Sequence, residues 1–348
     1  MAKLRLLSRA HVQEIITMEG AIGILEEAFA DFAAGNVTMP VRTPITAPEY
    51  NGLSLFMPAY IPGLKALGAK VVTVYKDNPA KFGLPNVMGT IILLNPETGA
   101  PVCIMDGRYL TAVRTGAVSG LATKYLARLD AKVHTLFGTG VQARTQAWAV
   151  AKSRELKRCL VFSIDDDEKK QAFAGEVTKL TGVQTEVAKD AENAVRACDI
   201  LTLATSAKEP IIDGSWVEPG THINAIGSHA PGMRELDTAT VVKSKVFPDS
   251  TEACMAEAGD FQIPVEEGAW SPDSIAADLG EVVAGSKTGR EADNDITLFK
   301  SVGLALQDMA TASYVYREAV ERGIGLSLIH ISEPTRPLYI SYAVFCLK

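Results

Sequence analysis

A twelve-residue stretch near the middle of the chain, residues 132–143, most constrains the fold. It reads Lys-Val-His-Thr-Leu-Phe-Gly-Thr-Gly-Val-Gln-Ala. The pattern predicts a short apolar strand over 133–137, a tight turn, and a helix beginning near Val141. Gly138 permits a sharp turn, Gly140 lets the backbone approach a pyrophosphate, and Ala143 allows the helix to lie close to the strand. The stretch indicates either a dinucleotide site at a helix N-terminus or an ordinary strand-to-helix turn.

The segments after this turn alternate between strand and helix patterns. Short apolar runs predict strands, and longer mixed runs predict helices. This alternation is typical of an α/β fold with a Rossmann-type, doubly wound parallel sheet. The predicted strands are 160–164, 183–187, 200–205 and 222–227, the predicted helices are 169–180 and 191–196, and a last helix-rich element covers 296–316.

The segments before the turn follow a different order. A helical pattern over 8–35, with Ser8 as a possible cap, comes first, and several β-rich runs separated by Pro, Gly and Asn follow it. These runs predict an antiparallel meander, and a helix over 109–129 leads from it to the glycine turn. The predicted strands are 53–57, 69–75, 89–94 and 101–105.

Composition narrows the classes of partner. The net charge of −7 gives no basic surface, so we expect neither nucleic acid nor an anionic membrane as a partner. No apolar run is long enough for a signal peptide or a membrane span, which predicts a cytoplasmic protein. The cysteines are scattered without metal-ligand spacing, so we expect reduced thiols and no metal site. They are Cys103, Cys159, Cys198, Cys254 and Cys346.

The last segment, residues 326–348, differs from the rest of the chain. Its two parts, 326–336 and 340–347, resemble in-frame translations of common sequencing-library adapters. We interpret 326–348 as a non-native tail rather than a natural β-prone ending, and exclude it from fold reasoning.

Three cations stand in unusual sequence surroundings. Arg42 lies in a Pro-flanked extended segment, Lys70 lies in an apolar strand, and Arg114 lies near a helix start. Most cations are solvated surface residues. A buried lysine, however, has a lowered pKa and can act as an acid or base, and arginine suits a carboxylate. Converging beside a nicotinamide, the three would bind the carboxylate of an amino or imino acid.

These features belong to a series of motifs that spans nearly all of residues 1–325. The motifs and their order along the chain resemble those of the ornithine cyclodeaminase/mu-crystallin family. The motifs are Met39-Pro-Val-Arg42, Met57-Pro-Ala-Tyr60, Lys70-Val-Val72, Asp106-Gly-Arg-Tyr-Leu-Thr-Ala-Val-Arg-Thr115, Gly138-Thr-Gly-Val-Gln-Ala143, Asn224-Ala-Ile-Gly-Ser228 and Phe299-Lys-Ser-Val-Gly-Leu304.

The resemblance implies a homodimer with two domains. Residues 1–118, completed by 301–325, would form an α+β substrate-binding and dimerisation domain, and residues 119–300 would form the Rossmann domain. The residues matching Arg42, Lys70 and Arg114 would hold the substrate carboxylate. Those matching Ser301 and Val302 would lie at the nicotinamide and the substrate.

Two neighbouring positions depart from the family pattern. Ornithine cyclodeaminases carry an acid/base aspartate where this chain has His229, and Met233 replaces a lysine expected four residues later. Histidine can act as a general acid near neutral pH, but it does not attract a distal ammonium as a carboxylate does. Ornithine cyclodeamination is therefore disfavoured. A capping or loop role for His229 stays open.

The cofactor is expected to be NAD, with NADP possible. An acidic run over 165–168 follows the second strand of the nucleotide fold, and carboxylates there bind a ribose 2′-OH and repel a 2′-phosphate. An acidic helix start would look the same, and the uncharged Ile164 is an alternative specificity position. The candidate cofactor-binding residues are Asn86, Arg114, Thr115, Gly138, Thr139, Gly140, Val141, Gln142, Asp165, Ala204, Thr205, Ile226, Ser228 and Ser301.

The sequence therefore favours an NAD(P)H-dependent reductase of a cyclic or acyclic imino acid, such as Δ1-pyrroline-2-carboxylate. Arg42, Arg114 and Val302 would contact the substrate, and Lys70 or His229 would protonate the developing amine. Alanine dehydrogenase and ornithine cyclodeaminase are the alternative enzymes. A dinucleotide-dependent ligand-binding protein of the mu-crystallin type is the non-enzymatic alternative.

Overall fold

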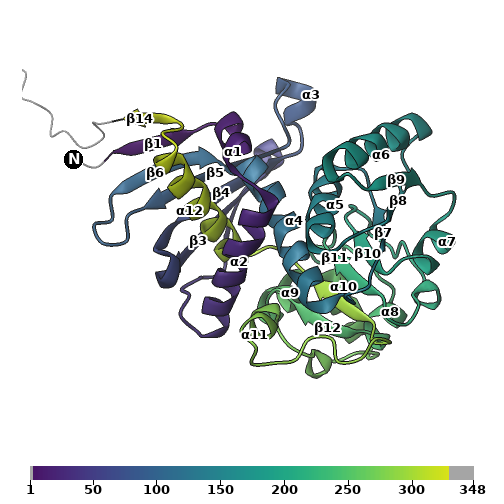
Figure 1. The fold of residues 1–348 in the computed structure, drawn as a ribbon. Coiled ribbons are helices and arrows are strands. Elements are labelled where there is room, and N and C mark those ends of the chain that lie inside the picture. The colour runs from purple at the N-terminus through teal and green to yellow at the C-terminus, as the bar shows by residue number, and fades with distance from the viewer. Residues whose placement is uncertain (1–2, 329–348) are drawn as a thin grey trace, which may run out of the picture.

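The computed structural model describes residues 3–328 and has two lobes, each built on its own seven-stranded sheet (Figure 1). The first sheet, sheet A, has the strand order β14-β1-β6-β5-β4-β3-β2. Its strands are β1 (Leu4–Leu7), β2 (Thr43–Ala47), β3 (Gly52–Ile61), β4 (Ala66–Tyr75), β5 (Val87–Leu94), β6 (Pro101–Asp106) and β14 (Leu326–Leu328).

Strands β2 to β6 form the predicted antiparallel meander, and β1 joins it in parallel to β6. Alternation along β4 decides which side chains enter the core. Lys70 stands opposite Met57 of β3 and Ile91 of β5, and all three side chains are buried on the inner face. Neighbours of opposite parity, such as Phe56 and Ile92, point to the outer face and are exposed.

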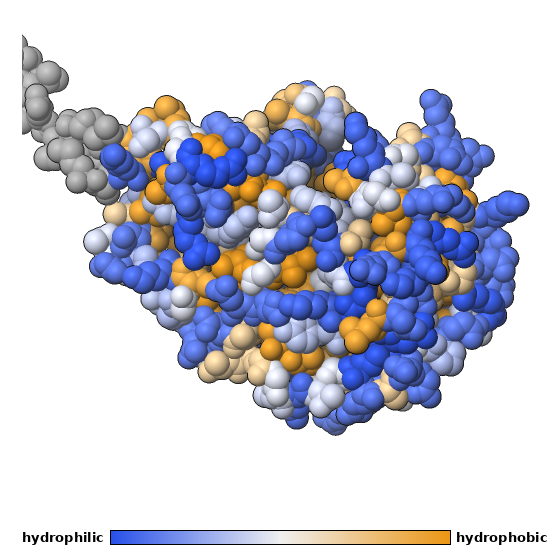
Figure 2. Space-filling view, in the orientation of Figure 1, coloured by the Kyte–Doolittle hydropathy of each residue, from blue (hydrophilic) through white to orange (hydrophobic). Residues whose placement is uncertain are grey.

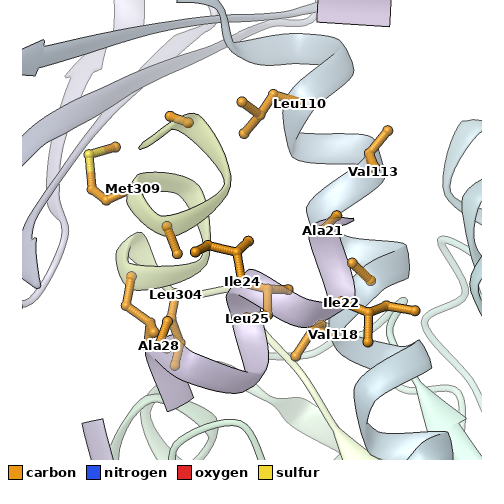
Figure 3. Packing of buried hydrophobic residues seen from close by; sticks show 14 of the residues in the cluster. Ala21, Ile22, Ile24, Leu25, Ala28, Leu110, Val113, Val118, Leu304 and Met309 are labelled. Atoms are coloured by element: carbon orange, nitrogen blue, oxygen red, sulfur yellow. The ribbon is translucent and has the colours of Figure 1, made fainter. Parts of the chain in front are cut away.

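Three long helices lie on the inner side of sheet A, where the last two pack directly against its strands and the first packs against those two helices. They are α2 (Met18–Ala33), α4 (Gly107–Leu126) and α12 (Ala305–Glu321). Their apolar side chains form one cluster, in which Leu25 of α2, Val118 of α4 and Met309 of α12 are completely buried (Figure 3). Helix α12 also packs against β3 and β4, so the end of the described chain completes the lobe that its beginning started.

The second sheet, sheet B, is entirely parallel and has the order β12-β13-β11-β10-β7-β8-β9. From β7 the chain runs outward through β8 to β9 and then crosses back to β10 on the other side of β7, which confirms the doubly wound fold and places the switch point between β7 and β10. The strands are β7 (Val133–Phe137), β8 (Arg158–Phe162), β9 (Gln184–Val187), β10 (Ile200–Leu203), β11 (His222–Ala225), β12 (Lys245–Pro248) and β13 (Thr297–Lys300).

Shorter helices connect these strands and cover both faces of sheet B (Figure 1). They are α5 (Val141–Ser153), α6 (Asp167–Thr181), α7 (Ala191–Arg196), α8 (Thr238–Lys243), α9 (Thr251–Glu257), α10 (Gly259–Glu266) and α11 (Leu279–Val283). The remaining elements of the described chain are α1 (Arg9–Ile15), α3 (Asn78–Phe82) and four short 3-10 turns, Pro48–Tyr50, Pro62–Leu64, Gly214–Trp216 and Pro272–Ser274.

Three sequence expectations need correction. The helical pattern over 8–35 is two helices, because the chain is extended at Ile16 and the Thr17 side chain caps α2 by accepting a hydrogen bond from Gly20 N. The expected helix over 109–129 begins at Gly107 and ends at Leu126. Residues 297–300 form strand β13, so the last helix begins only at Ala305.

The segment interpreted as a tail is described only at its start. Residues Leu326–Leu328 form β14 and pair antiparallel with β1 at the edge of sheet A. Residues 329–348 lie outside the described part of the chain. Within residues 3–328, no helix is both long and apolar enough to cross a membrane. On the face shown in Figure 2, hydrophilic side chains dominate and apolar residues form separate patches among them.

Candidate active site

The glycine turn after β7 opens one of two adjoining cavities. Gly138 has φ +106°, and a Cβ there would lie 2.8 Å from Ala204 O, so the turn requires glycine. At Gly140, the N-cap of α5, a Cβ would meet no atom within 4 Å, so the backbone faces open space. No side chain caps α5, which leaves its first N–H groups available for a phosphate.

This turn lines a cavity of about 610 Å³, named the nucleotide cavity here, which lies at the carboxyl ends of β7, β8 and β10. Its walls include the whole Gly138–Gln142 turn, Asp165 and Lys169 on one side, and Ala204 and Thr205 on the other. Ligands of doubly wound sheets bind at this edge, beside the switch point. The shape, the glycine backbone and the helix N-terminus fit a dinucleotide.

Asp165 organises the wall nearest to β8. Its carboxylate accepts hydrogen bonds from the hydroxyls of Thr139 and Ser163 and from Nζ of Lys169, the last at 2.5 Å. These donors, the Lys169 ammonium first, hold the pKa of Asp165 far below its usual value, so the carboxylate is ionised. Ile164 lies beside it in the lining of the nucleotide cavity and is fully exposed.

The second cavity, named the substrate cavity here, has a volume of about 260 Å³ and lies between sheet A and the ends of β11 and β13. Gln142 lines both cavities, and its buried Oε1 has no hydrogen-bond partner among the described residues. The lining of the substrate cavity brings together eight predicted site residues besides Gln142: Arg42, Lys70, Arg114, Thr115, Ile226, His229, Ser301 and Val302.

Lys70 and Arg114 share a carboxylate that sequence reasoning missed. Asp308 of α12 lies with one oxygen 2.6 Å from Nζ of Lys70, as an ion pair, and accepts a hydrogen bond at its other oxygen from Nε of Arg114 at 2.9 Å. Gln307 Oε1 accepts a second bond from Arg114 at 2.5 Å. The Asp308 side chain is completely buried and those of Lys70 and Arg114 nearly so.

Burial dominates the pKa of Lys70. Removal from water lowers it to about 8, against the attraction of Asp308, and the nearby Arg114 and Arg42 lower it further. An amine with this pKa is largely protonated at neutral pH and can give its proton to a substrate near that pH. The prediction that Lys70 is not a solvated surface lysine is confirmed.

Arg42 lies at the rim of the substrate cavity in an ion pair with Glu257 of α9, and both side chains are mostly buried. Burial raises the pKa of Glu257 although Arg42 opposes the shift. Arg42 therefore reaches the cavity as the family pattern implies, but with a carboxylate partner that the sequence did not indicate.

His229 lies in the substrate cavity with Nδ1 2.8 Å from Gly227 O. A carbonyl oxygen only accepts, so Nδ1 carries the proton and Nε2 of the neutral ring is an acceptor. Burial lowers the pKa of this imidazole. The ring is therefore neutral at neutral pH.

The other candidate residues have mixed surroundings. Ser301 donates to the buried Asp249 at 2.6 Å, and Ser228 donates to Met233 O at 2.6 Å beneath the loop. Val141 is exposed at the start of α5. Asn86 is exposed in the bend just before β5 and lines neither cavity, so its predicted contact with a cofactor stays a prediction. Within residues 3–328, no cluster of His, Cys, Asp and Glu is suited to a metal ion.

Comparison with known proteins agrees with this arrangement. A Δ1-pyrroline-2-carboxylate reductase of Bacillus cereus is 39% identical over 320 residues, which cover 92% of this chain and 98% of that protein. The structure of the Thermococcus litoralis Δ1-pyrroline-2-carboxylate reductase in complex with NADH and L-proline is 45% identical, with a TM-score of 0.88 over 93% of this chain and 100% of that one.

An archaeal alanine dehydrogenase dimer with bound NAD is 36% identical, with a TM-score of 0.87 over 94% of this chain and 99% of that one. The model of one protein family matches residues 3–323, which is almost the whole described chain. The chain thus belongs to the ornithine cyclodeaminase/mu-crystallin family.

Proposed function

We propose that this protein is an NADH-dependent imino-acid reductase that converts a cyclic imine such as Δ1-pyrroline-2-carboxylate to the L-amino acid. The carrying observation is the substrate cavity, in which Lys70, Arg114 and Arg42 meet an apolar wall beside the glycine turn. The relatives that are 39% and 45% identical carry the name of this reductase, and the second was solved with NADH and L-proline.

The charged residues of the substrate cavity have two roles, carboxylate binding and proton donation. The guanidinium groups of Arg114 and Arg42 bind the substrate carboxylate, and Lys70 donates a proton to the imine nitrogen. The nicotinamide, when bound, supplies the hydride for the imine carbon. His229 is a weaker candidate for the proton donor, because its Nε2 is an acceptor in the neutral ring and Nδ1 is bound to Gly227 O.

The cavity wall disfavours ornithine. The described residues that line the cavity include no Asp or Glu, and the lining beyond the cations combines aliphatic side chains such as Val72 and Val87 with uncharged polar ones. A distal ammonium would lose its hydration there without gaining a counter-charge. An apolar ring carries no such penalty.

The nucleotide cavity supports NAD as the cofactor. The ionised Asp165 stands where a ribose hydroxyl would be bound and a 2′-phosphate repelled. Lys169 also lines this wall, but its charge is paired with Asp165. NADP binding would require that pair to open.

We further propose a homodimer that associates through the outer face of sheet A. Phe56, Met88 and Ile92 are exposed there, with Ile45 beside them, although they are large and apolar. An uncovered apolar sheet face is typical of an interface. The proposed domains are 1–118 with 301–325, and 119–300; the boundary near 118 falls inside α4. A cytoplasmic location stays a prediction.

The test is cofactor oxidation by purified protein, measured with NADH and with NADPH. Δ1-pyrroline-2-carboxylate is offered first, pyruvate with ammonia second, and ornithine with NAD is assayed for proline. We expect rapid NADH oxidation with the cyclic imine. Consumption of ornithine alone would refute the proposal, and cofactor binding without any turnover would favour a ligand-binding protein.

Lys70→Met tests the proton donor, with Lys179→Met, an exposed lysine on α6, as its control. We expect the first substitution to abolish most of kcat and the second to change nothing. An unchanged rate in Lys70→Met would remove Lys70 from the mechanism.

A further inference from the structure

We propose that Glu235 is a positioning residue that fixes the two loops on which the cofactor is held, and that tight NADH binding requires its carboxylate to be ionised. The inference rests on the proposed placement of NADH in the nucleotide cavity. It concerns a residue that lines neither cavity and that the proposed reaction does not use.

Glu235 joins the ends of two neighbouring strands. Its Oε1 accepts hydrogen bonds from N and Oγ1 of Thr205, at 2.7 and 2.8 Å, just beyond β10. Its Oε2 accepts from Gly227 N at 2.7 Å, just beyond β11. A side chain at Gly227 would collide with this carboxylate, so glycine permits the approach. One buried carboxylate thus holds both loops at the ligand-binding edge of sheet B.

A second carboxylate fixes Glu235 itself. Asp260 of α10 accepts at Oδ1 from the backbone N–H groups of Glu235 and Leu236, at 2.8 and 3.0 Å. Its Oδ2 lies 2.7 Å from Nζ of Lys300, the last residue of β13. All three charged side chains are completely buried. The cluster therefore connects the carboxyl ends of β10, β11 and β13.

The connected loops reach both cavities. Thr205 lines the nucleotide cavity, while His229, two residues beyond Gly227, and Ser301, directly after Lys300, line the substrate cavity. A shift of the Glu235 carboxylate therefore moves the wall against which the cofactor lies. Small displacements of positioning groups are costly for binding and catalysis.

Only the ionised form satisfies all three donors. A protonated carboxyl or an amide carries hydrogen of its own, so either the Thr205 hydroxyl must stop donating and turn to accept it, or one backbone N–H loses its acceptor. The charged groups around Glu235 are Asp260 from α10, Lys300 from β13 and Arg234 in its own loop, and the neutral His229 is the other titratable group of that loop. Burial, followed by the charge of Asp260, raises the pKa of Glu235 to about 7, so it titrates near neutral pH.

The test is direct NADH binding to the full-length protein, measured by cofactor fluorescence across neutral pH. We expect the wild-type affinity to rise with pH as Glu235 ionises. Glu235→Gln keeps the shape and removes the charge, so we expect affinity lower by roughly tenfold or more and no rise with pH. A rise of affinity with pH that persists unchanged in this variant would overturn the inference. Glu209→Gln, an exposed glutamate after the same loop, is the matched control and should bind like the wild type.

A second variant covers the case in which Glu235→Gln does not fold. Thr205→Val removes one hydroxyl donor to the carboxylate and keeps the backbone N–H, so ionisation becomes harder and the midpoint of the pH dependence should move to higher pH. Equal NADH affinity in Glu235→Gln and the wild type would overturn the inference, as would an unmoved midpoint in Thr205→Val. Failure of the wild type to reduce any imine, with NADH binding intact, would instead overturn the proposed function alone.

Discussion

Replacing Asp308 by asparagine should damage both the stability and the pH profile of this protein. The amide keeps the shape of the side chain and removes its charge, which leaves Lys70 and Arg114 as buried cations without their shared counter-charge. Removing one partner of a buried ion pair costs about 3–5 kcal/mol. This is a large part of the total stability of about 5–15 kcal/mol that is typical of native proteins.

The same substitution should lower the pKa of Lys70 below its value of about 8, because Asp308 is the group that raises it against burial. Losing this attraction leaves burial and the neighbouring arginines unopposed, so the pKa moves further down. Lys70 donates its proton in the proposed reaction. The rate of the wild type should therefore fall as pH rises through about 8, and that of the variant should fall at lower pH.

Two measurements check this reasoning. Urea unfolding gives the loss of stability, and kcat with a cyclic imine and saturating NADH across the pH range gives the alkaline limb. Glu97→Gln is the control, because its ion pair with Lys65 is largely exposed and should matter little. An Asp308→Asn variant with unchanged stability and an unchanged alkaline limb would refute the assigned role of the buried carboxylate.

Three further substitutions test separate parts of the site. Arg114→Lys loses the planar fork and the bond to Gln307, so KM for the imine should rise by about tenfold or more, with NADH affinity, measured by fluorescence, nearly unchanged. Asp165→Ala removes the carboxylate proposed to bind the ribose and frees Lys169, so the preference for NADH over NADPH should fall several-fold. Equal kcat/KM ratios in variant and wild type would contradict the assignment. Gly138→Ala places a Cβ 2.8 Å from Ala204 O, on a residue whose φ is +106°, and should lower the free energy of unfolding by about 1–3 kcal/mol. Thermal or urea unfolding measures this loss. Gly175→Ala is the control and should show no such loss, because the added Cβ has open space.

The sequence predicted those parts of the site that depend on local pattern. The glycine turn, its flanking strand and the burial of Lys70 follow from residues within a few positions of one another. Asp308 could not be found this way, because it is 194 residues from Arg114 and joins it only when α12 packs against sheet A. The residues next to Asp308 in helix α12 give no sign that this aspartate is buried or paired with cations. Glu257, which is 215 residues from Arg42, escaped detection for the same reason.

The fold was least predictable between 228 and 300. Strands β12 and β13 have four residues each, and helices α8 to α11 are short, so hydrophobic periodicity has little length in which to appear. In β13 all four residues are buried, Lys300 included, because the strand lies inside sheet B with neighbours on both sides. From the sequence alone, a lysine predicts an exposed position. Only the ion pair with the buried Asp260 explains why Lys300 is buried. Tertiary contacts, and not local preference, decide this region.

The return of α12 to the first sheet determines when the active site can form during synthesis. Sheet B needs nothing beyond β13, whereas the inner face of β3 and β4 stays uncovered until residues 305–321 have left the ribosome. Until then Lys70 and Arg114 have no Asp308, and two cations face each other without compensation. Domains fold in the order in which they are made. The nucleotide lobe of this protein is therefore completed first, and Lys70 in the other lobe acquires its counter-charge among the last events of folding.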